Sequence, residues 1–148
     1  MSLKYKISFG LNLCIVLAGF LMGASYLARS EITSYHKEVI GVDWAGLAPG
    51  VQKLLVILMK GTGDAALVAA VSIGILLLIP FRRRENWARW AILIIGLTLL
   101  VPMLIGAVYL ASTTGASSPW WLNAVLMLFL IVGFLLSGEL NRRPRRIS

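Results

Sequence analysis

The chain has 148 residues, of which 59% are hydrophobic and only 14% are charged. A soluble domain of this length would be nearer half apolar and about a quarter charged. The net charge of +8 comes from basic residues in short runs beside long apolar segments, which is typical of membrane topology and not of a nucleic-acid-binding face. We therefore expect one integral membrane domain, residues 1–148, with membrane lipids and no nucleic acid as partners.

The first apolar run, residues 7–27, has the length of a helix that spans a bilayer. A signal peptide is the rival interpretation, but its apolar region is usually only about 7–15 residues long, so we expect a retained helix. Gly19 and Gly23 form a GxxxG pattern, which lets two helices approach closely. We predict helix-packing seams at this pair and at a second row of small residues, Ala66, Ala70 and Gly74.

Residues 28–50 form the most polar segment and contain mixed charges and His36, the single histidine. Proline and glycine near its end, at Pro49 and Gly50, indicate a loop before the next helix. Whether this loop folds over the helices is left open by the sequence.

The next apolar run, residues 51–81, is too long for a simple span, because a continuous helix would measure about 46 Å against a hydrocarbon core of about 30 Å. One possibility is a single long helix that projects beyond the membrane. The other is a short interfacial helix, residues 51–60, that bends at Gly61 and Gly63. We favour the continuous helix, with residues 54–81 as the second span.

Two further spans follow, residues 89–111 and residues 120–137, and a basic tail, residues 138–148, ends the chain. Ten of the fourteen lysines and arginines lie in the amino end, the turn at 82–89 and the tail. Basic residues are concentrated on the cytoplasmic side of membrane proteins. The sequence therefore predicts an all-α, four-helix up-down bundle in a bacterial inner membrane, with both termini in the cytoplasm.

Lys60 and Asp64 stand four residues apart inside the second apolar run, and ionisable residues at membrane depth suggest a functional site. Asp64 lies about 24 Å from Pro80, just under the outer interface. Lys53, Lys60 and Asp64 share one helix face. We expect this face to point into the bundle or into a water-filled cavity. The alternative is structural, with Lys60 extended toward water and Asp64 paired with it.

The candidate ligand-binding residues are those expected at the same outer level as this pair. They are Lys60, Asp64, His36, Tyr109, Trp120 and Asn123.

No catalytic motif is present in the sequence, so we assign no catalytic residue. A metal or haem site that needs two histidines, or a histidine with cysteines, is excluded by the single His36 and the single Cys14. We expect no cofactor and no metal.

Several stretches resemble a set of small uncharacterised bacterial proteins with four transmembrane helices. They are residues 35–44, 52–55, 79–83 and 87–90. The layout is also similar to that of the DoxX-like membrane proteins. The resemblance implies a bacterial inner membrane and no particular reaction.

Three functions remain open, in this order. The first is a non-catalytic accessory subunit or partner-binding module of a larger membrane complex or homo-oligomer, with the small-residue seams as its contacts. The second is a binder or carrier of a lipid, quinone or other amphiphile in an outward-facing cavity near Asp64. The third is a membrane enzyme that uses Asp64, Lys60 or His36 as acid or base, which requires two of them at one pocket.

Overall fold

The computed structural model describes residues 2–138, and every regular element in this range is helical. The all-α prediction is therefore confirmed for these residues. The predicted basic tail lies outside the described residues from position 139 onward. In chain order the elements are α1 (Leu3–Ala28), α2 (Ser34–Ile40), the 3₁₀-helix η1 (Trp44–Gly46), α3 (Pro49–Leu76), the π-helical turn η2 (Leu77–Phe81), α4 (Asn86–Thr114) and α5 (Trp120–Leu136).

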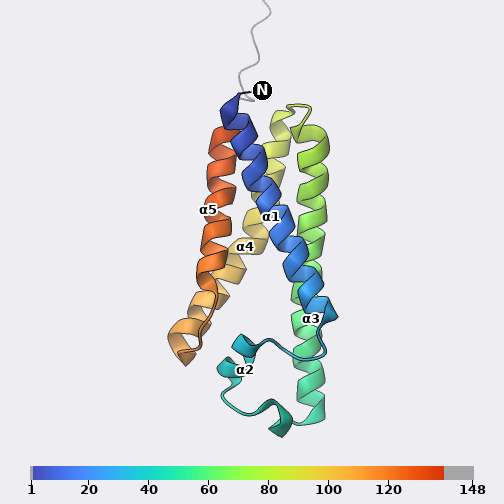
Figure 1. Ribbon diagram of the computed structural model, residues 1–148, viewed down its shortest axis with the longest axis vertical. Coiled ribbons are helices and arrows are strands. Elements are labelled where there is room, and N and C mark those ends of the chain that lie inside the picture. Colours follow the sequence, from blue (N-terminus) through green and yellow to red (C-terminus); the bar gives the residue numbers. More distant parts are fainter. Residues whose placement is uncertain (1, 139–148) are drawn as a thin grey trace, which may run out of the picture.

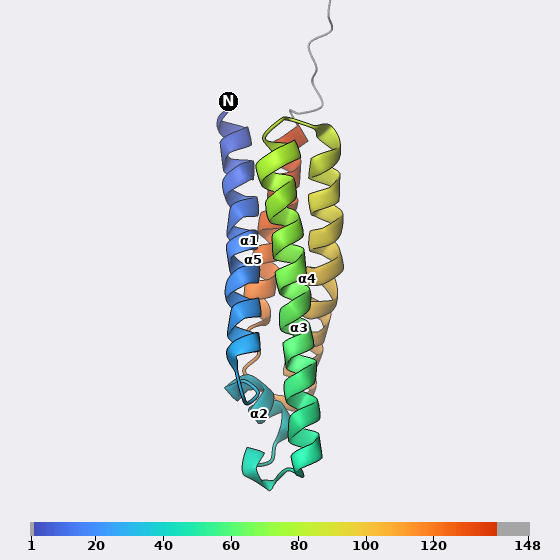
Figure 2. The ribbon, with the colours of Figure 1, turned by 90° about the vertical axis from the view of Figure 1, so that its right-hand side faces the viewer.

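The four longer helices α1, α3, α4 and α5 lie side by side along the long axis (Figures 1 and 2). α1 contacts α3 and α5, and α4 contacts the same two helices. The short helix α2 lies at the end of the molecule away from the amino terminus (Figure 1). We call this end, with residues 28–50, the loop end, and the opposite end, with Tyr5 and Phe81, the amino end.

The helix boundaries follow from local chemistry. The Ser2 side chain accepts a hydrogen bond from the backbone N–H of Tyr5, 3.3 Å away, and so caps α1. Pro49 stands in the first turn of α3, where its missing N–H costs nothing. α2 and α4 end at Gly41 and Gly115, with φ of 68° and 69°. Glycine adopts this left-handed conformation without strain.

α3 is one uninterrupted helix from Pro49 to Leu76, and Gly61 and Gly63 lie inside it. Between these glycines, Oγ1 of Thr62 donates to the carbonyl oxygen of Leu58, one turn earlier in the same helix, at 3.2 Å. Residues 51–60 are thus continuous with the second apolar run and do not form a separate interfacial helix.

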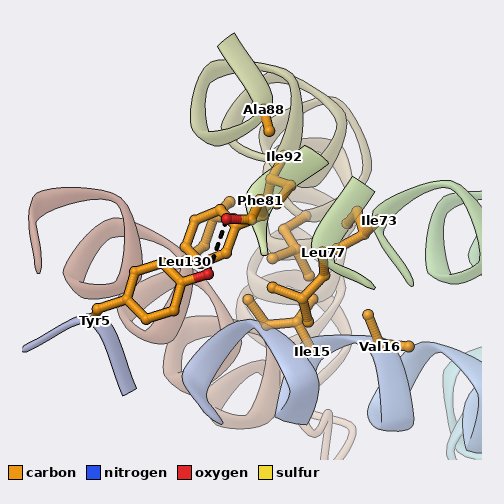
Figure 3. Packing of buried hydrophobic residues seen from close by; sticks show 10 residues of the cluster. Tyr5, Ile15, Val16, Ile73, Leu77, Phe81, Ala88, Ile92 and Leu130 are labelled. Carbon is orange, nitrogen blue, oxygen red and sulfur yellow. Dashed lines mark hydrogen bonds between the residues drawn. The ribbon is translucent and has the colours of Figure 1, made fainter. Parts of the chain in front are cut away.

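The apolar core is concentrated toward the amino end, where residues from all four long helices meet (Figure 3). The Tyr5 hydroxyl donates to the carbonyl oxygen of Phe81 at 2.8 Å, and the two rings stack with centroids 5.2 Å apart. This contact joins the start of α1 to the end of η2. The core residues are Tyr5, Ile15, Val16, Ile73, Leu77, Phe81, Ala88, Ile92, Leu100 and Leu130.

Toward the loop end, α1 and α3 approach closely through small residues. A Cβ atom added at Gly19 would lie 2.9 Å from the Cβ of Ala70 and 3.3 Å from the carbonyl oxygen of Ala66. One added at Gly23 would lie 2.8 Å from the carbonyl oxygen of Gly63. The two rows of small residues therefore pack against each other within the chain. A Cβ atom added at Gly74 would lie 3.6 Å from Cγ1 of Val16, which is an ordinary van der Waals distance.

Three helical stretches in the described part of the chain are long and apolar enough to cross a membrane. They are Leu3–Ala28, Pro49–Phe81 and Asn86–Thr114, with 26, 33 and 29 residues. α5 is apolar but shorter, with 17 residues.

Candidate functional site

The face of α3 that carries the charged residues points away from the other helices. Met59, Gly63, Ala66, Ala70 and Ile73 form the buried side of α3. Lys53, Asp64, Val68, Val71 and Ile75 lie on the opposite side and are exposed. Figure 2 shows α3 in front of the other long helices, with none of them covering its near side.

The expectation was that this face points into the bundle or into a water-filled cavity. The first alternative is wrong for Lys53 and Asp64, which are exposed, whereas Lys60 is half-buried and Lys53 lines a cavity at the loop end. The reason lies in side-chain volume. Helices associate in membranes through close backbone approach, so the small residues of α3 select the packed side. The charged side is left outside.

Lys60 and Asp64 do not pair with each other. Within residues 2–138, Asp64 is exposed, Lys60 is half-buried, and neither side chain takes part in a hydrogen bond or an ion pair. The salt bridge expected in the structural alternative is absent from this part of the chain. Asp64 therefore presents an unpartnered carboxylate on the exposed side of α3, one turn from Lys60 and beside the apolar residues Val68 and Val71.

The depth of Asp64 follows from its neighbours. Gly63 packs against Gly23 and Tyr26, close to the end of the apolar run of α1. Counted from Pro80, at the other end of the helix, Asp64 is about 24 Å along the axis. A hydrocarbon core of about 30 Å that begins at Pro80 would extend about one turn beyond Asp64. Lys60 would lie at its edge.

His36 lies in α2, apart from the charged face of α3, at the contact between α2 and the long helices. Its ring lies 4.9 Å from the ring of Tyr35 and 6.3 Å from that of Tyr26 in α1, measured between centroids. Nδ1 of His36 and Oγ1 of Thr33 are joined by a hydrogen bond of 2.6 Å. Burial lowers the pKa of His36 below its ordinary value, because it penalises the charged imidazolium.

A second contact holds α2 to the connection between α4 and α5. Oε2 of Glu38 accepts hydrogen bonds from the backbone N–H and the hydroxyl of Ser117, at 3.0 and 2.8 Å. These two bonds lower the pKa of the Glu38 carboxyl, because they stabilise its charged form. α2 thus bridges the two halves of the loop end.

Two cavities open at the loop end. One, of about 230 Å³, lies between α2 and α3, and its polar residues are His36 and Thr62. Its apolar lining consists of Ile32, Val39, Ile40, Leu55, Leu58 and Met59. The other, of about 430 Å³, is lined by residues that include Glu31, Gln52 and Lys53. Neither of these cavities is lined by Lys60 or Asp64.

The remaining predicted ligand-binding residues stand apart from both cavities. Tyr109 in α4 and Trp120 in α5 are exposed, and Asn123 is half-buried in α5. None of these three lines either loop-end cavity. The structure therefore does not bring the six candidates together, and of the six only His36 lines one of the two cavities.

A group of buried polar residues at the amino end is not among the predicted site residues. Ser8 Oγ donates to the carbonyl oxygen of Gly133 at 2.6 Å, and Asn12 Nδ2 donates to the carbonyl oxygen of Ser8 at 2.8 Å. A Cβ atom at Gly133 would lie 2.9 Å from Asn12 Nδ2. Polar residues four apart on an apolar helix were the available signal, because membrane helices place such residues inward. This group joins α1 to α5.

Among residues 2–138, no three histidine, cysteine, aspartate or glutamate side chains lie close enough together to hold a metal ion.

The fold and the exposed apolar surface define an all-helical membrane protein, with three helices able to cross the bilayer by length and composition. Comparison with family models, with curated proteins and with solved structures gives no match to this chain. The resemblance to DoxX-like proteins and to the small bacterial four-helix proteins stays a prediction.

Proposed function

We propose that the protein is a small, non-catalytic membrane protein that binds a protein partner within the bilayer through the exposed face of α3. We call the residues Lys53, Ile57, Lys60, Asp64, Val68, Val71 and Ile75 the α3 stripe. The observation that carries the proposal is the exposed, unpartnered carboxylate of Asp64 on this stripe. A charged group facing lipid is costly, and charged groups in membrane helices almost always find partners.

Lysine and aspartate differ in how they escape this cost. The long stem of Lys60 lets its ammonium group extend to the interface. Asp64 has a single methylene and cannot reach as far. A basic or hydrogen-bond-donating group on another protein is therefore the partner that this position calls for.

From the sequence, the small-residue seams were expected to contact a partner. We propose that the α3 stripe makes this contact instead. Gly19, Gly23, Ala66 and Ala70 are used between α1 and α3, so these seams are not available to a second protein. The other functions find less support. The cavity lined by His36 contains neither Lys60 nor Asp64, so the two groups that an acid–base enzyme needs do not share it. An amphiphile site near Asp64 stays a prediction.

We further propose that α5 is the fourth span of an up-down bundle in a bacterial inner membrane. Its 17 residues stand at the short limit of spanning helices, and Trp120 and Trp121 at its start suit the headgroup layer. The basic turn at 82–84 lies at the amino end, and the distribution of positive charge supports our proposal that this end and both termini are cytoplasmic.

The test compares complexes extracted from native membranes. Protein isolated with its surrounding lipid in polymer discs is expected to run larger than a monomer on a native gel. The combined substitutions Lys60→Met and Asp64→Asn are expected to release the monomer, because they remove the charges that need a partner. The matched control is Lys37→Met with Glu31→Gln, which removes an exposed ion pair of 2.7 Å at the loop end. An unchanged complex in the Lys60/Asp64 variant would contradict the proposal.

A further inference from the structure

We infer that the partner of the α3 stripe is a second copy of this chain, bound about a two-fold axis that runs along the membrane normal. This inference rests on the proposed function and names its partner. A dimer of this kind is isologous, so the same patch is used on both subunits and must be complementary to itself. The α3 stripe meets that requirement.

The charges of the stripe are arranged for reciprocal pairing. Two copies in one membrane have the same orientation, so their α3 helices run parallel and equal positions lie at equal depth. Lys60 stands four residues, or about 6 Å, from Asp64 along the axis. A lysine side chain spans this distance, so Lys60 of each copy can reach Asp64 of the other. Two ion pairs form, and both carboxylates acquire the partner that they lack within one copy.

The rest of the stripe suits a close helix–helix contact. Gly61 and Ala65 flank Asp64 and are exposed, and a Cβ atom at Gly61 would meet nothing within 4 Å. Small residues of this kind let parallel helices approach in lipid. Beyond Asp64 the contact continues through exposed β-branched residues, Val68, Val71 and Ile75.

The exposed sides of α4 and α5 offer no comparable surface. Ile94, Ile105, Leu128 and Leu135 are all exposed, and no charged residue occurs in α4 after Arg89 or anywhere in α5. An apolar surface without charge can be covered by lipid tails and does not require a protein partner. Charge complementarity thus selects α3.

The first experiment maps the contact by disulfide cross-linking of purified protein reconstituted into lipid vesicles. The background carries Cys14→Ser. In it, Val68→Cys places a thiol at the centre of the stripe, and Ile105→Cys is the matched control on α4. Their native side chains are 66% and 64% exposed. Mild oxidation is expected to give a covalent dimer from the Val68→Cys protein and little from the Ile105→Cys protein. Equal cross-linking at both positions would indicate random collision and overturn the inference.

The second experiment tests the reciprocal pairs by exchanging charges in the Val68→Cys background. Lys60→Asp alone or Asp64→Lys alone places like charges together across the axis. Each is expected to lower the cross-linking yield by about fivefold or more. The double exchange, Lys60→Asp with Asp64→Lys, restores self-complementarity and is expected to restore the yield. That recovery also shows that the exchanged chain folds.

Single exchanges without effect, or a double exchange that fails to recover, would overturn the homodimer. The two proposals fail separately. If the purified protein does not cross-link, yet the complex in native membranes still depends on Lys60 and Asp64, the partner is a different protein and the proposed function stands.

Discussion

Gly10 and Gly23 show how the position of one residue type on α1 decides its role. A Cβ atom at Gly10 would meet nothing within 4 Å, whereas one at Gly23 would lie 2.8 Å from the backbone oxygen of Gly63. Its other nearest neighbours are Cγ and Cδ2 of the Leu67 side chain, but the oxygen of Gly63 is a backbone atom and cannot move aside as a side chain can. The close approach of α1 to α3 therefore depends on Gly23 having no side chain.

We predict that Gly23→Ala lowers the unfolding free energy by about 1–3 kcal/mol, the usual cost of overpacking a well-packed interface. Gly10→Ala is the control, and it should leave stability unchanged or raise it slightly, because alanine favours helix more than glycine does. Thermal unfolding in detergent, followed by circular dichroism, compares the two variants. Equal melting temperatures for both variants would contradict the close approach at Gly23.

The same residues show what could be predicted at this scale. The GxxxG pattern and the second small-residue row are visible in the sequence, but the sequence suggests Gly63, which contacts Gly23 in the structure, only as a possible bend and not as part of a packing seam. The outward orientation of Asp64 could not be predicted either. α3 is apolar on nearly every side, so hydrophobic periodicity does not indicate which side is packed. The decision rests on side-chain volume at Gly63, Ala66 and Ala70.

At the scale of elements, α2 is the least predictable part of the fold. The sequence indicated only a polar loop for residues 28–50, because a helix of seven residues is not stable by itself. Its position depends on tertiary contacts, the rings around His36 and the hydrogen bonds between Glu38 and Ser117. The contact between Glu38 and Ser117 joins residues 79 positions apart in the chain and leaves no local pattern.

We predict that α2 detaches more readily in acid. Burial lowers the pKa of His36 in the folded state, so the neutral ring stabilises docking fully above the unfolded value of about 6.5. This stabilisation is lost as the pH falls below that value and through the folded pKa. Hydrogen exchange of residues 34–40, corrected for intrinsic rates, is expected to be faster at pH 5 than at pH 7.5.

The variant His36→Phe keeps an aromatic ring and removes the titration. In it, the difference in exchange between the two pH values should largely disappear. An acid-dependent difference as large as in the original protein would assign the effect to another group, such as Glu38.

At the scale of the whole molecule, length and hydropathy were sufficient to predict an all-helical membrane protein. This succeeds because backbone polar groups in lipid must be satisfied within helices. The number of helices that cross the membrane is harder to predict from length and hydropathy. The helix α5 has only 17 residues and is shorter than the three stretches able to cross a membrane, but it packs against α1 and α4.

We predict that the loop end faces outward and the amino end faces the cytoplasm, because the basic residues concentrate at the amino end. The test uses single cysteines in the Cys14→Ser background at Val42 and at Arg84, both exposed. A membrane-impermeant maleimide added to intact spheroplasts is expected to label Val42→Cys. It should label Arg84→Cys only after lysis. The reverse pattern would invert the topology.

The unbroken course of α3 and η2 has a mechanical consequence. The 33 residues from Pro49 to Phe81 form a rod of about 50 Å, of which about 20 Å extends past a hydrocarbon layer of about 30 Å. Helices adjust to bilayer thickness by tilting. Since α2 packs beside this overhang, a tilt of about ten degrees displaces the loop end sideways by about 3 Å. A change in bilayer thickness is therefore expected to move the segment that carries His36.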